Sequence, residues 1–504
     1  MNRSLFVSTA TAFCAVVLAS ASALAQGSAG YAAAWAEPNE GVVQTSASAR
    51  MMRMQPAQSP FTPEEAAPLP DPGYNGAAKQ PQRIPGAASQ TMAPSACDPT
   101  CGCGPDEIVC DPTCGEAGCG GAGCRERTCR WCRCGTLADP WTLPLPCALR
   151  SRDITVGGWL SGGLFVNAYG DESNGPLGFR NLATGSADQA YIFGERKVNT
   201  SESVFDWGFR ADFLFGMDAP KTQAFGDEDW DFDWDTSRDY GSAMPQAYVE
   251  FGWNDLTIKG GRFFTPMGYE GVQATSRFFY STSYMQYYAE PFTHTGALAT
   301  YKFSDRLSGS AGWVSGWDGG WRNLNGASMV LAGVNWTPGE RFSLAWYISA
   351  GRFGDGRYSG NNGDLFLSTL VATLKLTERL TYVFQNDYAE NDGLPGNAET
   401  EWYGINQYLL YKLNDCWSVG TRFEWFRDDD GVRVTSDGIA RVLGNPGNYY
   451  EVTVGLNYKP HANITIRPEV RYDVYDGPIV ADRPFNRGNS SSQWSGGFDM
   501  IFTF

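Results

Sequence analysis

The sequence has few of the residues on which nucleic-acid-binding proteins and histidine-dependent enzymes rely. Only two of its 504 residues are histidine, charged residues make up 18%, and the formal net charge is -17. An acidic chain disfavours nucleic acid as a partner, because that interaction needs basic surface. Two histidines also leave little material for a histidine-based catalytic or metal site.

Long apolar runs are missing too. Past the N-terminus there is no stretch of ~18 or more apolar residues, which excludes a conventional membrane-spanning helix. Mean hydropathy is negative at -0.32, yet aromatic residues reach 14% and glycines number 59. A polar average combined with many aromatic residues is typical of β-structure with one wet face.

Residues 1–25 have the pattern of a secretory signal peptide. Arg3 supplies the positive start, an apolar stretch covers roughly residues 10–19, and Ala-Leu-Ala before Gln26 fits small-x-small cleavage. The remaining chain is therefore expected to be exported, so that its cysteines meet an oxidising compartment.

Two segments are expected before the main domain. Residues 26–96 are rich in Pro, Ala and Gln and cannot offset the entropy of ordering, which predicts a disordered linker; a wall-binding or partner-binding tail is the alternative. Residues 97–150 hold eleven cysteines separated by Gly, Asp and Pro, so this periplasmic segment needs covalent or metal staples. Export favours disulfides, and the Cys129-x-x-Cys132 spacing leaves zinc as the alternative.

From residue 151 to 504, apolar and polar residues alternate along about sixteen segments. Phe205, Trp207 and Phe209 share one face of such a segment, for example, while Asp206 and Arg210 share the other. Each segment is about as long as the ~9–11 residues with which a tilted strand crosses a bilayer. The segments lie near 153–168, 187–200, 204–217, 244–253, 256–265, 293–303, 307–317, 328–337, 341–352, 365–376, 380–390, 401–413, 416–427, 448–459, 463–475 and 492–504.

The connections alternate between minimal turns, such as Asn254-Asp255, and long loops rich in Gly, Asp and Asn. This alternation is typical of a barrel with one end in the periplasm and the other outside. The predicted fold is therefore an all-β, transmembrane, antiparallel up-and-down β-barrel of about sixteen strands, which leaves no unpaired edge in lipid. The last strand ends on Phe504, which resembles the signal read by outer-membrane barrel insertion machinery.

Five motifs, taken in order, carry a family resemblance. They are PQAYVE at 245–250, GRFFTPMGYE at 261–270, FFYS at 278–281, EPFTHTG at 290–296 and GWVSGWD at 312–318. With them, residues 152–504 resemble a family of β-barrel outer-membrane porins of the general-porin type. The resemblance implies a channel in an outer membrane and does not extend to residues 26–150.

A barrel of about sixteen strands is wide enough for a water-filled channel. The faces predicted to point inward carry charges of both signs, which would orient polar solutes and set ion selectivity. The alternative is that these charges pair with one another and stiffen the wall. The predicted pore-lining residues are Arg210, Asp212, Glu250, Lys259, Arg422, Glu424, Arg467, Glu469, Arg471 and Asp473.

Residues 266–291 form the third long loop, the position that folds into the lumen in general porins. An aromatic constriction there would favour sugars or other weakly charged solutes over bare ions, whereas an external loop packed on its neighbours is the alternative. The candidate constriction residues are Tyr269, Glu270, Phe278, Phe279, Tyr280, Tyr284 and Tyr287.

Other chemistries have weaker support. The acidic loop around 227–239 could hold Ca²⁺ at Asp229, Asp231, Asp233 and Asp235, although a solvated loop is the plainer interpretation. No other cofactor is expected. A hydrolase would need His294 beside Ser281 or Ser283, and nothing in the spacing demands that, so the protein is not expected to be an enzyme.

The sequence thus predicts an outer-membrane porin that allows passive diffusion of small hydrophilic solutes. The alternative is a structural or surface-interaction barrel with a plugged lumen and no transport. Expected partners are outer-membrane lipid and the insertion machinery that reads the C-terminal strand, and the size is compatible with a homotrimer.

Overall fold

The alternating segments fold as strands at the predicted places. The structure is a computed structural model, and it describes residue 137 and residues 139–504 apart from 202, 225–230, 232–233, 235–238, 323–325, 355–362, 394–397, 435–443 and 481. The predicted signal peptide, the predicted linker and most of the predicted Cys-rich segment lie outside the described residues.

The strands follow one another along the chain with little else between them. They are β1 Thr155–Asn167, β2 Thr184–Arg196, β3 Phe205–Gly216, β4 Gly241–Ala243, β5 Ala247–Trp253, β6 Leu256–Phe264, β7 Thr293–Ser304, β8 Leu307–Val314, β9 Ser328–Gly339, β10 Phe342–Arg352, β11 Asp364–Lys375, β12 Leu380–Gly393, β13 Ala398–Lys412, β14 Trp417–Asp428, β15 Gly447–His461, β16 Ile464–Asp476 and β17 Ser492–Thr503.

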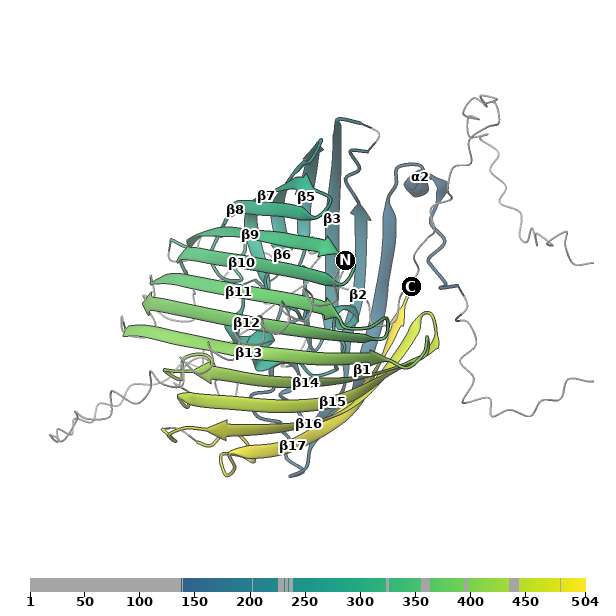
Figure 1. Cartoon of the computed structure of the whole chain (residues 1–504). Coiled ribbons are helices and arrows are strands. Elements are labelled where there is room, and N and C mark those ends of the chain that lie inside the picture. Colours follow the sequence, from purple (N-terminus) through teal and green to yellow (C-terminus); the bar gives the residue numbers. More distant parts are fainter. Residues whose placement is uncertain are drawn as a thin grey trace, which may run out of the picture. The chain divides into compact units, whose positions relative to one another are not determined.

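All seventeen strands belong to one antiparallel sheet, in which each strand pairs with its neighbours in sequence (Figure 1). The short β4 and the longer β5 both pair with β3, so they share one position and the wall has sixteen. β1 pairs with β17 from Trp159 opposite Thr503 to Asn167 opposite Ser495, which closes the sheet. The predicted closed barrel of about sixteen strands is confirmed.

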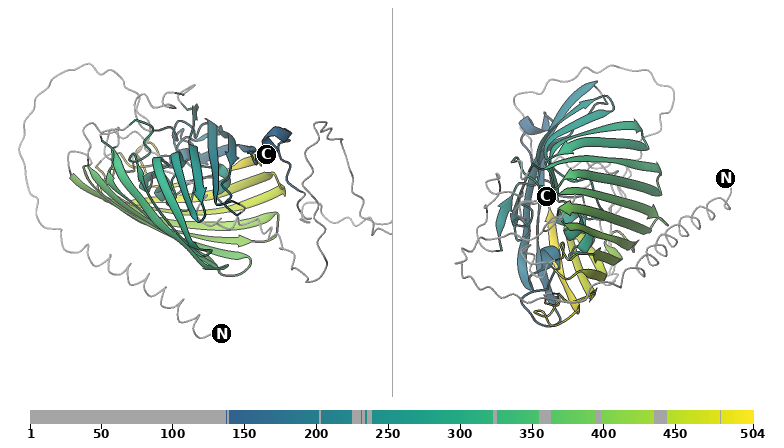
Figure 2. Two further views of the ribbon diagram at one scale, coloured as in Figure 1. Left: turned by 90° about the horizontal axis from the view of Figure 1, so that it is seen from above. Right: turned by 90° about the vertical axis from the view of Figure 1, so that its left-hand side faces the viewer.

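The two faces of the wall differ in composition along almost every strand. In β3, Phe205, Trp207 and Phe213 are exposed on the outer face, whereas Arg210 and Asp212 are buried on the inner face. Apolar side chains outside and polar ones inside are what a bilayer and an aqueous lumen select. Figure 2 shows this wall from two further directions.

Helical structure among the described residues is limited to α2 Cys147–Arg150, the 3-10 turns η1 Gly178–Arg180 and η2 Ala274–Ser276, and the π-helical turn η3 Met285–Ala289. None of the helices in this part of the chain is long and apolar enough to cross a membrane.

Several predicted boundaries differ from the structure by a few residues, and two of them have a clear structural cause. The second strand was expected at 187–200 and ends at Arg196, because Val198 turns over the inner side of the wall against Gly208 and Gly252. The segment 244–253 was expected as one strand and is interrupted at 244–246, where the backbone carbonyl of Gln246 still accepts a hydrogen bond from the backbone N–H of Asp212 at 2.9 Å.

The chain reaches β1 along the end of the barrel that carries the short turns, here called the turn end. The backbone of Trp141 exchanges hydrogen bonds of 2.8 and 2.7 Å with the side chain of Asn463, in the β15–β16 turn, and its ring stacks on Phe502. Cys147 is the described member of the predicted Cys-rich segment, and its thiol is free and exposed.

Candidate functional site: the barrel interior

The segment that joins β6 to β7 lies inside the barrel. This inward loop, residues 265–292, includes η2 and η3, and nearly all of its side chains are buried. Gly268 has φ of 84°, and a Cβ there would collide with the carboxylate of Glu290, so the turn requires glycine.

Two carboxylates of the wall hold the backbone of the inward loop. Glu424 on β14 accepts hydrogen bonds from the backbone N–H groups of Tyr284 and Met285, both at 2.6 Å. Glu469 on β16 accepts from the N–H groups of Tyr280 and Ser281 at 2.7 and 3.0 Å. Each carboxyl group therefore anchors two consecutive backbone N–H groups of the loop.

Arg422 on β14 connects the same wall to the loop through ion pairs. Its guanidinium bonds to Glu270 of the loop at 2.6 Å and to Glu451 of β15. It also donates to the carbonyl of Ser281 at 3.0 Å. All three charged side chains are buried, so removing Arg422 would leave two carboxylates without their counter-charge.

Two arginines of β16 repeat this arrangement. Arg467 forms a two-pronged ion pair with Asp499 of β17 at 2.8 and 2.6 Å and donates to the carbonyls of Ala274 and Arg277. Arg471 pairs with Asp473 at 2.7 Å and donates to the carbonyl of Thr282 at 2.6 Å. We call the inner face of β14 to β17 the covered wall, because the inward loop occupies its hydrogen-bonding groups.

The loop also reaches the inner face of β2. The side chain of Gln189 accepts from the N–H of Ala274 at 2.9 Å and donates to the carbonyl of Val272 at 2.7 Å. The Tyr280 hydroxyl donates to Asp188 at 2.9 Å and lies beside Arg180 of η1, which pairs with that aspartate. Burial raises the pKa of Tyr280, so its hydroxyl stays neutral and keeps its proton to donate.

The end of the loop lies against β12, where two acidic side chains meet. Gln385 donates to Glu290 at 2.7 Å and to Asp387 at 3.1 Å, while its carbonyl accepts from the N–H of Tyr269 at 3.0 Å. Burial, and next to it the charge of Asp387, raise the pKa of Glu290 well above its usual value. Glu290 therefore favours its neutral form in this site.

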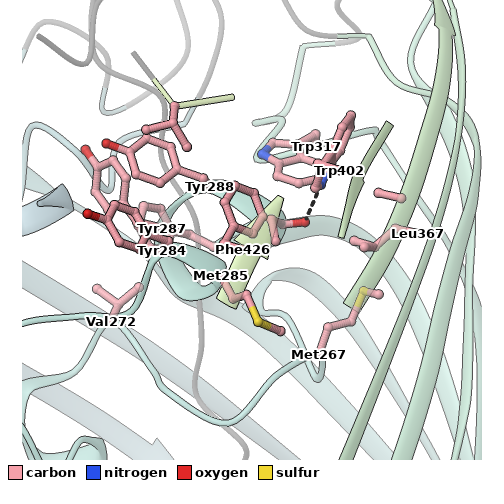
Figure 3. Close-up of a cluster of buried hydrophobic side chains, with 14 of the residues drawn as sticks. Met267, Val272, Tyr284, Met285, Tyr287, Tyr288, Trp317, Leu367, Trp402 and Phe426 are labelled. Carbon is pink, nitrogen blue, oxygen red and sulfur yellow. Dashed lines mark hydrogen bonds between the residues drawn. The ribbon is translucent and has the colours of Figure 1, made fainter. Parts of the chain in front are cut away.

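Aromatic and aliphatic side chains fill the space between the loop and the end of the barrel that carries the long connections, here called the loop end. Tyr284, Tyr287 and Tyr288 of the loop belong to the same buried cluster as Trp317 and Trp402 (Figure 3). The Trp402 indole N–H donates to the carbonyl of Ala289 at 3.2 Å. We call this set, with its other buried members on the wall, the aromatic cluster.

The inner face of β5 to β9, here called the open wall, borders two hollows near the turn end. The larger, of about 750 Å³, is lined among others by Thr257, Thr300 and Ser308. The smaller, of about 260 Å³, is lined by Glu250 and Lys259, which lie opposite each other in the β5–β6 register. Both hollows are lined by polar and charged groups together with apolar side chains such as Val198.

Buried polar atoms continue along the inner face from the open wall. Asn335 Oδ1 on β9, Ser349 Oγ on β10 and Thr373 Oγ1 on β11 have no hydrogen-bond partner among the described protein atoms. Buried polar atoms nearly always bond to protein or to ordered water. This side of the interior is therefore suited to water.

The predicted pore-lining residues all lie on the inner face, in two environments. Arg422, Glu424, Arg467, Glu469, Arg471 and Asp473 are on the covered wall. Arg210 and Asp212 pair with each other at 2.8 Å on β3, where Glu195 is a further partner of the arginine. Glu250 and Lys259 border the smaller hollow. Their role in lining a pore stays a prediction.

The predicted constriction residues are placed together inside the barrel. Tyr284 and Tyr287 join the aromatic cluster, and Glu270 bonds to the covered wall. Phe278 and Phe279 pack in a second buried cluster with Tyr408 and other side chains of β11 to β13, against which Tyr269 also packs. The structure thus places this loop in the lumen, and its effect on passage stays a prediction.

Some interior residues were missed from the sequence. Glu451, Asp499, Gln385 and Asp387 lie on the inner side of the same alternation that identified their neighbours, so the pattern could have found them. Arg180 could not be found this way, because it lies in a loop and meets Asp188 only in the folded barrel.

The weaker chemistries gain no support from the described residues. Asp231 is buried against Arg262 at 2.7 Å, and Asp229, Asp233 and Asp235 lie outside the described residues, so the calcium site stays a prediction. No group of three or more potential metal ligands occurs in the part of the chain that was described. No hydrogen bond joins His294 to Ser281 or Ser283 there, since the serines bond to Arg422 and to Gln286.

The closed wall, polar interior and inward loop define a porin-type barrel. The chain belongs to the family described as "Putative beta-barrel porin-2, OmpL-like", which matches residues 153–504, so the predicted resemblance is confirmed. A search of curated proteins gives no match.

Solved structures of outer-membrane proteins are similar to this chain. The outer membrane channel DcaP of Acinetobacter baumannii is 11% identical, with a TM-score of 0.48, and the match covers 70% of this chain and 97% of that one. OmpT of Vibrio cholerae is 12% identical with a TM-score of 0.44 and the same coverage. The anion-selective porin from Comamonas acidovorans is 10% identical with a TM-score of 0.43, covering 70% and 99% of the two chains.

Proposed function

We propose that this protein is an outer-membrane channel for passive diffusion of small hydrophilic solutes, and that its aqueous path follows the open wall. The observation that carries the proposal is the pair of hollows of about 750 and 260 Å³, which the open wall borders with polar and charged side chains. The smaller hollow extends to β2 and β3. In a barrel of the porin family, such a surface is where hydrated solutes can pass.

The covered wall is unsuited to that task in this arrangement. Its arginines and carboxylates bond to the backbone and to the Glu270 side chain of the inward loop. A solute would therefore compete with hydrogen bonds that already exist. On the open wall, Glu250 and Lys259 present both signs of charge across one strand pair. These two residues are the proposed selectivity determinants of the channel.

This proposal includes no catalytic step and no cofactor. It places the chain in the outer membrane, with the exposed apolar face of the barrel against lipid and the strand that ends at Phe504 as the feature read during insertion. Residues 1–25 would direct export, and residues 26–150 would stay in the periplasm.

The test is single-channel conductance of the full-length protein, purified from outer membranes and added to a planar bilayer. We expect discrete open steps and a reversal potential, measured in a salt gradient, that shifts when Glu250 is replaced by Gln. Absence of steps from protein shown to be folded and inserted would refute the channel.

A second candidate is a closed, structural barrel without transport. The aromatic cluster favours it, because that cluster packs apolar side chains between the inward loop and the wall at the loop end. The same recording separates the two functions: a closed barrel stays silent until residues 272–288 are deleted, whereas a channel conducts with its loop intact.

A further inference from the structure

The outer face of the barrel is apolar at mid-height on most strands. β14, β15 and β16 expose Phe423, Val454 and Val470 there, and comparable side chains occur around the wall. Lipid selects such residues, because polar groups find no hydrogen-bond partner in hydrocarbon. Any departure from this composition needs a physical reason.

The outer face of β11 to β13 departs from it. Asn386 on β12 is exposed and Gln407 on β13 is partly exposed, and both point outward because their neighbours in sequence are buried inside. Ser368 lies on the same face of β11. The Ser368 hydroxyl accepts from the Trp346 indole N–H at 3.0 Å, so we call Asn386 and Gln407 alone the amide patch.

The two amides lie at mid-height of the lipid-facing belt. Gln407 is four residues from Tyr403 and four from Tyr411, the outward tyrosines toward either end of β13, so each is about 14 Å away along the strand. Asn386 also lies between two outward tyrosines of β12, four residues from Tyr382 and two from Tyr388, and is therefore closer to the loop end than Gln407. Tyrosines at the two ends mark the membrane interfaces, so both amides are at the depth of the hydrocarbon.

The barrel satisfies only part of their hydrogen-bonding capacity. Asn386 donates to the carbonyl of Gly404 at 2.9 Å, and Gln407 accepts from the Tyr382 hydroxyl at 2.7 Å. Within the described residues, these are the hydrogen bonds that the two side chains make. The Asn386 oxygen and N–H groups of both amides remain to be bonded.

We propose that the amide patch is the contact surface for a second copy of this chain in the membrane. The occupant must itself be embedded at this depth, and it must offer both donors and acceptors. A second copy does both, because an amide donates and accepts at once. Other membrane proteins are the competing occupants that the test distinguishes.

A two-fold axis along the membrane normal fits the register of the patch. Asn386 pairs with Ile405 and Phe384 with Gln407, so the two amides lie diagonally on neighbouring strands. An axis between β12 and β13 would bring Asn386 of one copy against Gln407 of the other, twice. The proposed assembly is therefore a dimer, in which both copies contribute the same patch. A trimer would instead join two different surfaces at each contact.

The first experiment replaces both amides by leucine. Asn386→Leu with Gln407→Leu suits the lipid face, so we expect a folded barrel whose dimer, measured by light scattering in detergent, dissociates at least tenfold more readily than the wild type. Asn448→Leu is the matched control, because Asn448 is an outward amide on β15 that accepts from Trp425 at 3.0 Å. An unchanged dimer in the double variant, or a monomeric wild type, would overturn the proposal.

The second experiment detects the contact directly by photo-crosslinking. A photo-crosslinking amino acid at position 386 of the full-length protein should give, in outer membranes, an adduct of twice the chain mass that contains only this sequence. The same probe at position 470 on β16 should give none. An adduct with a different protein, a threefold species, or no adduct at position 386 would refute the dimer.

The proposed dimer rests on the proposed outer-membrane location, and different results would refute each of them. Protein that does not fractionate with outer membranes removes the basis of both. Protein that is inserted and conducts, but forms no doubled adduct, removes the dimer alone.

Discussion

The covered wall and the open wall carry the same types of residue at equivalent positions, but these residues have different surroundings. Glu424 and Glu250 are both inward glutamates on strands, yet Glu424 bonds to two backbone N–H groups of the inward loop while Glu250 borders a hollow. The difference teaches that an inward charge is not by itself a pore-lining charge. The packing of the loop decides which inward charges are bonded to it and which border a hollow.

The largest effect is expected from removing the loop itself. Deleting residues 272–288 should expose the covered wall and raise single-channel conductance several-fold, because the lumen of a sixteen-strand barrel is wide without an inserted loop. Unchanged conductance would show that the path lies elsewhere, and the two walls would no longer differ.

Arg422→Ala should be the most damaging point change. It leaves Glu270 and Glu451 buried without their counter-charge, a loss of about 3–5 kcal/mol for a buried pair. We expect a lower urea-unfolding midpoint and cleavage of the inward loop by added protease. Arg210→Ala, on β3 outside the covered wall, is the control, and a loop as protected in Arg422→Ala as in this control would contradict the anchor.

Glu424→Gln should release the loop more gently. The amide oxygen can accept only one of the two hydrogen bonds, and its NH2 group faces the other N–H, so we expect about 1–3 kcal/mol less stability and noisier open-channel current. The matched variant Glu250→Gln should leave the noise unchanged. Equal noise in both variants would show that neither wall holds the loop.

Glu290→Gln should change how stability depends on pH. The pKa of Glu290 is raised in the folded barrel, so the wild type loses stability as pH rises from about 4.3 through the folded pKa. Asp387, Glu270 and Glu424 are the charges that disfavour its ionised form. Unfolding midpoints measured from pH 4 to 9 should fall less steeply in the variant, and equal slopes would refute this role.

The smallest effect is expected on the open wall. Lys259→Gln should shift the cation-to-anion permeability ratio toward cations by a few-fold, because the residue borders a hollow. Arg467→Gln on the covered wall should leave the ratio unchanged in any channel that retains its loop. A reversed pattern would exchange the roles of the two walls.

Much of the wall could be predicted from the sequence, because successive side chains of a strand point to opposite faces. The segments near 205–217, 449–459 and 464–475 alternate so regularly that the inward side of Arg422, Glu469 and their neighbours followed directly. The predicted boundaries of β2 and of β4–β5 were less accurate. The conformation of Val198 and of residues 244–246 is determined by packing inside the barrel and not by the local alternation.

The site was only partly predictable. The aromatic loop at 266–291 was expected in the lumen by analogy, and the structure places it there. Its partners could not be foreseen, since Glu424 meets Tyr284 across 140 residues and Gln385 meets Glu290 across 95. Such contacts depend on how the closed wall brings distant strands around one loop.

By itself, the sequence determined the strand number, the closure of the barrel and the face on which each side chain lies, because alternation, turn residues and strand length act locally and repeat along the chain. Only the tertiary structure decided which inward charges are covered by the loop, which hollows remain, and that two outward amides lie side by side on β12 and β13. Those outcomes depend on contacts between segments that only closure of the sheet brings together.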